Sequence, residues 1–193
     1  AMYAAKRSGG SLVRFHSQPV NARLVHRRAL ADALPEAIRS GSLHLDFQPV
    51  VSLDSLCIVG FEALVRWDHP VFGLLGPDDF VPIAEESALI LGLDEWVLAS
   101  AASQIASWNV AADGRLDVWV NLSARSLTRS DLADRILELQ NEFGLRIGVE
   151  LTERDGFASP AQAEHAFARL RSAGINVALD DFGTGRSSLF RAV

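Results

Sequence analysis

The chain has 193 residues, of which 49% are hydrophobic and 22% are charged, a composition typical of a globular protein. The formal net charge is −6 and the basic residues are scattered, so a surface for duplex nucleic acid is not expected. The single cysteine, Cys57, excludes an internal disulfide and indicates a reducing compartment, so we expect a cytoplasmic location.

The first part of the chain predicts the end of one folded unit followed by a connection. The opening "AMYAAKRSGGSLVRFH" has the pattern of the last turns of a helix, a stop at Gly9 and Gly10, and a short strand through Phe15. Residues 18–42 are predicted to be a linker that runs into a helix, because "HRRALADALPEAIRSG" carries apolar residues at helical spacing and ends in glycine.

From residue 43 the hydrophobic pattern changes to that of alternating strands and helices. Residues 43–53 and 57–67 predict two strands joined by a short turn, which permits an antiparallel pair. Further helices are expected at 77–91, 94–112, 126–143 and 160–173, and further strands at 115–123, 146–153 and 176–181. The uncharged stretch from 96 to 112 is interrupted by polar residues and predicts a buried helix, not a membrane span. This alternation favours parallel β/α units, as in a barrel or a doubly wound sheet.

Polar side chains gather where the predicted strands end. They are Glu62 with Arg66, Asn121 with Ser123, Glu150 with Glu153, and Asp180 with Asp181. In a barrel the carboxyl ends of the strands meet at one face, so these groups are expected to form one site. The oxygen ligands suit Mg²⁺ or Mn²⁺, and the adjacent aspartates suit two ions. Two such ions about 4 Å apart are typical of enzymes that attack phosphodiesters in line.

Each of these residues also has a structural interpretation when taken singly. Asp180 and Asp181 could cap a helix that begins near Ser187. Glu62 could be a paired structural carboxylate, and Asn121 could satisfy backbone groups. Taken together, the four clusters at successive strand ends favour a functional site.

The motifs resemble those of the EAL domain family, which hydrolyses the bacterial second messenger cyclic di-GMP to linear pGpG. Glu62-Ala63-Leu64 matches the name-giving tripeptide, and "FQPVV", "FVPIAEES", "VNLS", "ELTE" and "DDFGTGRSSL" follow the family's order. The resemblance implies an α/β fold, a TIM-like (β/α) barrel with an antiparallel first strand. The opening residues, "AMYAAK", resemble the end of a GGDEF, or diguanylate cyclase, domain. We therefore expect a GGDEF remnant at 1–17, a linker and helix at 18–42, and the N-terminal part of an EAL barrel at 43–193.

The resemblance also implies a role for particular residues. It implies that one ion is held by Glu62, Asn121, Glu150 and Asp180, and that Asp181 helps to hold a second. The substrate contacts that it implies are Gln48, Leu64 and Arg66, with the arginine reaching a phosphate. Glu153 would anchor the loop 182–188, whose glycines let it fold over the dinucleotide.

The family's later motifs, which include the glutamate that acts as general base, are expected after Val193. We therefore expect an incomplete barrel with five of about eight strands, inactive alone and active as a phosphodiesterase in an intact parent protein. The expected partners are cyclic di-GMP and a second copy of the EAL domain in a homodimer. The alternative is a receptor or regulatory module that binds cyclic di-GMP without turnover. No membrane segment is predicted in this chain, although a parent protein could be anchored elsewhere.

Overall fold

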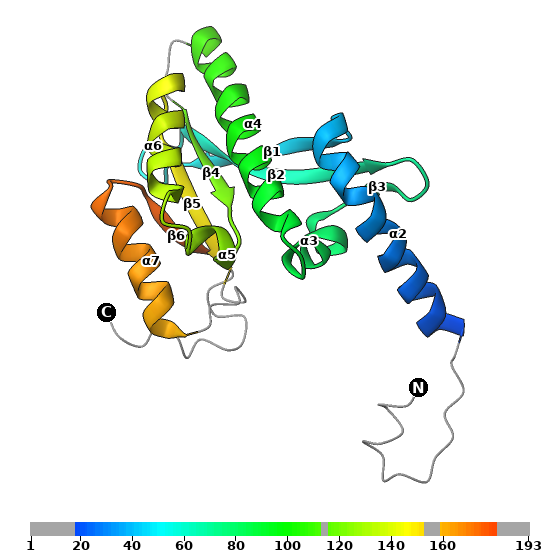
Figure 1. Ribbon diagram of the computed structural model, residues 1–193. Coiled ribbons are helices and arrows are strands. Elements are labelled where there is room, and N and C mark those ends of the chain that lie inside the picture. Colours follow the sequence, from blue (N-terminus) through cyan, green and yellow to red (C-terminus); the bar gives the residue numbers. More distant parts are fainter. Residues whose placement is uncertain (1–17, 113–115, 153–158, 181–193) are drawn as a thin grey trace.

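A computed structural model describes residues 18–112, 116–152 and 159–180 of the chain (Figure 1). The strands in this part are β1 Leu43–Val51, β2 Ile58–His69, β3 Gly73–Leu75, β4 Asp117–Asn121, β5 Ile147–Thr152 and β6 Val177–Asp180. The helices are α2 Gln18–Ser40, α3 Pro77–Glu85, α4 Leu89–Ala112, α5 Ala124–Leu127, α6 Leu132–Phe143 and α7 Pro160–Ser172. The predicted N-terminal remnant at 1–17 lies outside the described residues.

The described strands form one mostly parallel sheet in the order β1-β2-β4-β5-β6, with β3 paired only to β2. β1 and β2 are antiparallel, and β2, β4, β5 and β6 are parallel neighbours joined through helices. This arrangement confirms the predicted α/β fold and its antiparallel first strand.

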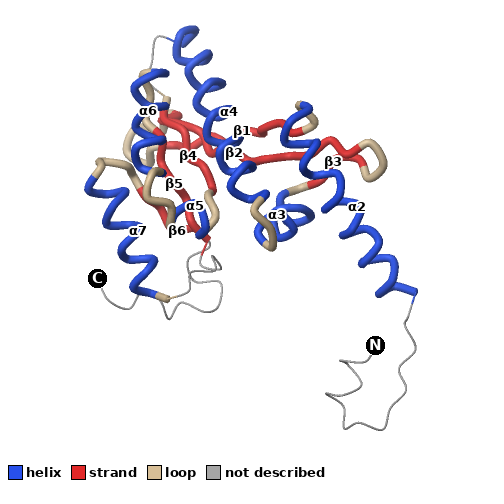
Figure 2. Tube along the Cα trace, viewed as in Figure 1, coloured by secondary structure: helices blue, strands red, loops and turns tan. Residues whose placement is uncertain are grey.

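Helices α4, α6 and α7 cover one face of the parallel strands (Figures 1 and 2). The strand side chains on that face are fully buried, and they include Val118, Val120 and Val149. Side chains that alternate with them, such as Trp119 and Asn121, are only half-buried on the opposite face. The apolar alternation therefore decides which side chains enter the helix-covered core and which remain available for a site.

One close contact on the opposite face requires a glycine. Gly148 and Trp119 are register partners on β5 and β4, and a methyl group added to Gly148 would overlap the indole ring of Trp119. The ring therefore lies directly over the backbone of the neighbouring strand. Trp119 is also the register partner of the predicted ligand Glu62 on β2.

Several element boundaries differ from the predictions. The break between α3 and α4 lies at 86–88, where the Ser87 hydroxyl donates to the Ala84 carbonyl and accepts from the Leu89 amide, and Gly92 lies inside α4. The single helix predicted at 126–143 is divided into α5 and α6. β2 runs to His69, and the short strand β3 that follows it was not predicted.

Helix α4 is the long apolar element of the fold. By length and composition alone its segment Leu89–Val110 is long and apolar enough to cross a membrane. In the structure Ala101, Ala102 and Ile105 of this helix are fully buried in the protein core. Their burial agrees with the prediction of a buried helix in this stretch.

His69 stabilises the turn between β2 and β3. Its Nδ1 accepts hydrogen bonds from the backbone amides of Val71 at 3.1 Å and Phe72 at 3.2 Å. Burial lowers the pKa of the His69 imidazole, and positive charge on His26 acts in the same direction. Protonation of Nδ1 would remove the lone pair that accepts the hydrogen bonds from both amides. The folded state therefore favours the neutral ring.

We predict that this histidine makes folding stability depend on pH. Because the pKa of His69 is lower in the folded state, its contribution to stability is complete above the unfolded value of about 6.5 and is lost as the pH falls below it. The free energy of unfolding, measured with denaturant between pH 8 and pH 5, should fall less in His69→Asn than in the wild type. His165→Asn, at an exposed position, is the control and should keep the wild-type slope.

Gly148→Ala should destabilise the protein by about 1–3 kcal/mol, because the new methyl group would force the Trp119 ring to move. Gly92→Ala is the matched control, since nothing lies within 4 Å of a methyl group added there and alanine favours a helix by roughly 1 kcal/mol. Denaturant unfolding measures both effects. Equal stabilities for the two variants would contradict the proposed overlap.

Candidate active site

The strand register brings three of the predicted ligands to one face of the sheet. Asn121 at the end of β4 is the register partner of Glu150 on β5. Glu62 on β2 pairs with Trp119, two residues before Asn121, so all three side chains point to the face opposite the helices. The strand register therefore brings together groups that are 29 to 88 residues apart in sequence, on the face that the alternation predicted. Asn121 lies at the end of β4, whereas Glu62 lies in the middle of β2 and not at its predicted end.

Glu62 and Asn121 are in direct contact. The Asn121 Nδ2 donates a hydrogen bond of 2.7 Å to Oε1 of Glu62. Because a carboxylate only accepts, the amide nitrogen must face Glu62 and the amide oxygen must point away from it. That oxygen, Oδ1, is buried and has no hydrogen-bond partner among the described residues.

These residues fit a divalent cation. A buried oxygen without a partner is costly, and a cation would satisfy it. Glu62 and Glu150 add carboxylate oxygens, so the donor set is the hard one that Mg²⁺ and Mn²⁺ prefer. In the described part of the chain, no three His, Cys, Asp or Glu side chains lie close enough together to hold a metal ion. The described donors are therefore two carboxylates and one amide.

The remaining predicted ligands are only partly described. The backbone of Asp180 ends β6 and is the register partner of Thr152, two residues beyond Glu150. This register places Asp180 at the same end of the sheet as Asn121. Asp181, the predicted anchor Glu153 and the loop 182–188 lie outside the described residues.

A cleft of about 430 Å³ opens beside these groups. Its lining includes Glu62, Leu64, Asn121 and Glu150 from the sheet. The other walls come from α3 and α4, which contribute Asp78, Val81, Pro82, Glu85, Ile90, Leu93, Asp94 and Val97. The site is thus bounded by strand ends on one side and by two helices on the other.

Two of the helix residues are carboxyl groups with raised pKa values. Burial raises the pKa of Glu85, and the negative charge of Asp94 raises it further. Burial also raises the pKa of Asp94, while hydrogen bonds from Ser123 act in the opposite direction. The cleft therefore holds one exposed and one buried carboxyl group whose negative charges repel each other, and a bound cation would reduce this repulsion.

Of the predicted substrate contacts, Leu64 lines the cleft, whereas Gln48 and Arg66 are not among its lining residues. Gln48 on β1 is exposed and is the register partner of Glu62. Arg66 follows Leu64 along β2, and its Nε contacts Oδ2 of Asp46 at 2.8 Å. The guanidinium that was predicted to reach a phosphate is therefore held by a carboxylate in this structure.

Sequence reasoning missed Asp94 and the contacts it makes. Its Oδ2 accepts hydrogen bonds from the backbone amide of Ser123 at 3.1 Å and from the Ser123 hydroxyl at 2.6 Å. Ser123, which the alternation predicted to face inward with Asn121, lies beyond the end of β4 and caps α5. The signal in the sequence was the charged pair Asp94 and Glu95 within the apolar run "LILGLDEWVL", and of these two only Asp94 is buried.

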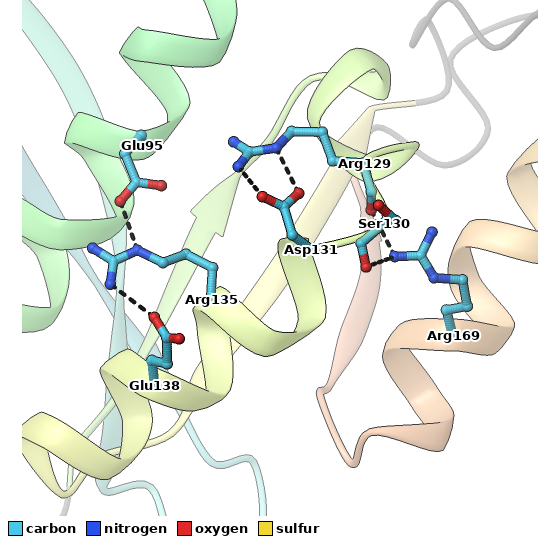
Figure 3. Close-up of polar contacts among 7 residues, drawn as sticks. All are labelled: Glu95, Arg129, Ser130, Asp131, Arg135, Glu138 and Arg169. Carbon is cyan, nitrogen blue, oxygen red and sulfur yellow. Dashed lines mark hydrogen bonds and ion pairs between the residues drawn. The ribbon is translucent and has the colours of Figure 1, made fainter.

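A second polar network holds the helices in place, and none of its residues lines the cleft (Figure 3). Arg135 on α6 bridges Glu95 of α4 at 2.7 Å and Glu138 of α6 at 3.3 Å. Arg169 on α7 donates to the carbonyls of Arg129 and Ser130 at 2.6 and 2.7 Å. These contacts join α4, α6 and α7 around the segment that follows Ser123.

A mostly parallel sheet with an oxygen-lined cleft beside its strands is an arrangement found in α/β enzymes, including those with a TIM-like barrel. The chain belongs to the EAL domain family, whose family model matches residues 31–192.

Relatives of the chain include proteins named as cyclic di-GMP phosphodiesterases. The chain is 36% identical to the cyclic di-GMP phosphodiesterase NbdA of Pseudomonas aeruginosa over 98% of its own length, and 33% identical to the bifunctional diguanylate cyclase/cyclic di-GMP phosphodiesterase MucR of that organism over the same share. It spans only 24% and 28% of those two proteins. Among solved structures it is similar to the PaMucR phosphodiesterase in complex with c-di-GMP, with a TM-score of 0.73 and 32% identity over 83% of this chain and 66% of that one.

Proposed function

We propose that the chain forms the cation-binding part of a phosphodiesterase domain that hydrolyses cyclic di-GMP to linear pGpG. The observation that carries the proposal is the buried Asn121 Oδ1, which has no partner among the described residues and lies between two carboxylate-bearing strands. The proposed substrate is supported by the names of two similar proteins. NbdA is named a cyclic di-GMP phosphodiesterase, and the PaMucR phosphodiesterase was solved in complex with c-di-GMP.

In this proposal one group of residues binds the ions and another binds the substrate. Glu62, Asn121, Glu150 and Asp180 hold one divalent ion, Mg²⁺ or Mn²⁺, and Asp181 contributes to a second. The ions supply an activated water and neutralise charge on the phosphate. Gln48 and Leu64 contact the substrate, and Arg66 exchanges Asp46 for a phosphate oxygen, because both are anions that suit the guanidinium.

The remaining parts of the proposal come from the family resemblance. Glu153 anchors the loop 182–188 over the substrate, and the general base lies among residues that follow Val193 in a longer protein. Residues 1–17 are proposed as the end of a GGDEF domain, and the active form as a homodimer. MucR, a relative named as both cyclase and phosphodiesterase, supports a tandem arrangement of the two domains.

The alternative function is a receptor that binds cyclic di-GMP without cleaving it. A receptor needs the substrate contacts but not the catalytic ions. The two functions therefore differ in whether the cation is required for turnover.

The test is release of pGpG from cyclic di-GMP with Mn²⁺, by the 193-residue chain and by a version extended through the residues expected after Val193. We expect turnover only in the extended version, because loss of a general base typically costs about 10²–10⁴ in rate. Chelation, and separately Glu62→Ala, should abolish that turnover.

Three results would count against the proposal. Turnover that survives exhaustive chelation would contradict the role of the cations. Tight binding of cyclic di-GMP without any cleavage by the Mn²⁺-loaded extended version would establish the receptor. Efficient turnover by the 193-residue chain would show that the general base is not where the family resemblance implies.

A further inference from the structure

Asp94 is an unusual residue for its position in the fold. It lies near the start of α4, lines the cleft, and is only 5% exposed. In the described part of the chain it is the one acidic residue among the buried side chains. Burying a carboxylate is unfavourable, and an apolar residue of similar size would usually give a more stable core. A reason other than packing is therefore needed for a carboxylate at this place.

Both hydrogen bonds to Asp94 come from a single residue. The Ser123 amide and hydroxyl both donate to Oδ2, at 3.1 and 2.6 Å. The Ser123 oxygen in turn accepts from the amide of Ser126 at 3.3 Å and so begins α5. The nearby arginines Arg129 and Arg135 pair with Asp131 and Glu95, so within the described ranges the direct contacts of the Asp94 carboxylate are with this turn.

The turn is the direct continuation of the cation site. Asn121 ends β4, and Ser123 follows it by two residues. Between them the Leu122 amide donates to the Glu150 carbonyl at 3.3 Å. The backbone after Asn121 is thus fixed at two successive points, to β5 through Leu122 and to α4 through Ser123. The side chain of Asn121, whose Nδ2 donates to Glu62 at 2.7 Å, is attached to this fixed segment of backbone.

We propose that Asp94 is a positioning residue for the cation site: by binding Ser123 it fixes the end of β4, so that Oδ1 of Asn121 points to the ion. This inference rests on the function proposed above. Groups that orient metal ligands from behind typically change metal affinity about 10- to 100-fold when they are removed. A residue that merely stabilised the fold would change the melting temperature and leave the affinity of the folded protein unaltered.

The experiment measures Mn²⁺ binding to the 193-residue chain by calorimetry, without substrate. We expect Asp94→Ala to raise the dissociation constant about 10- to 100-fold. Asp94→Asn keeps one acceptor oxygen and should raise it less. Ser123→Ala removes the hydroxyl that donates the 2.6 Å hydrogen bond, and it should also raise the dissociation constant. Glu95→Gln is the matched control, because Glu95 lies next to Asp94 on α4 but contacts Arg135 (Figure 3) and is not among the residues that line the cleft. It should leave Mn²⁺ affinity unchanged.

The increase in melting temperature on adding Mn²⁺ gives a second readout that separates folding from binding. A smaller increase in Asp94→Asn and Ser123→Ala than in the wild type and Glu95→Gln supports the proposal. Lower stability with an unchanged Mn²⁺ increase and unchanged affinity overturns it and leaves the proposed function standing. If the wild type binds no Mn²⁺, or if Glu62→Ala binds it as tightly as the wild type does, the cation site itself is wrong and the role of Asp94 fails with it.

Discussion

The register between the parallel strands determines whether this protein has a site at all. Asn121 and Glu150 are directly paired on β4 and β5, and Glu62 reaches the same face from β2. A slip of one residue in any of these pairings would turn an oxygen ligand toward the helices and an apolar side chain toward the cleft. The register is set by burial of Val118, Val120 and Val149 beneath the helices. The same alternation of side chains along the strands therefore determines both the hydrophobic core and the ligand set.

Two polar groups at the cleft are buried at a cost in folding stability. The Asn121 oxygen is buried without a partner among the described residues, and Asp94 is buried as a carboxyl group. Both arrangements are unfavourable in a simple core. Both residues line the cleft, whereas the core beneath the helices is almost wholly apolar. Local cost of this kind is common where a binding site is built in advance of its ligand.

Much of the fold could be predicted from periodicity. The strands, the antiparallel first pair and the face on which Glu62, Asn121 and Glu150 lie follow from alternation and from the order of elements. The break after Glu85 could not, because it depends on the capping bonds of Ser87 and not on Gly92, which a helix tolerates. The bond between Asp94 and Ser123 joins residues 29 apart on different elements, and the pairing of Arg66 with Asp46 joins two strands. Such contacts arise from tertiary packing, which local patterns do not encode.

The order of strands in the sheet has a consequence for how the chain assembles. β1 and β2 pair through a short local turn, and β4, β5 and β6 then follow in space in the same order as in sequence. Each new strand therefore adds to an edge that is already complete, and no strand has to be inserted between two earlier neighbours. A chain emerging from the ribosome can build this sheet progressively, with every α/β unit docking on the one before it. Glu62 and Asn121 then come together when β4 docks on β2, and Glu150 and Asp180 follow as β5 and β6 are added.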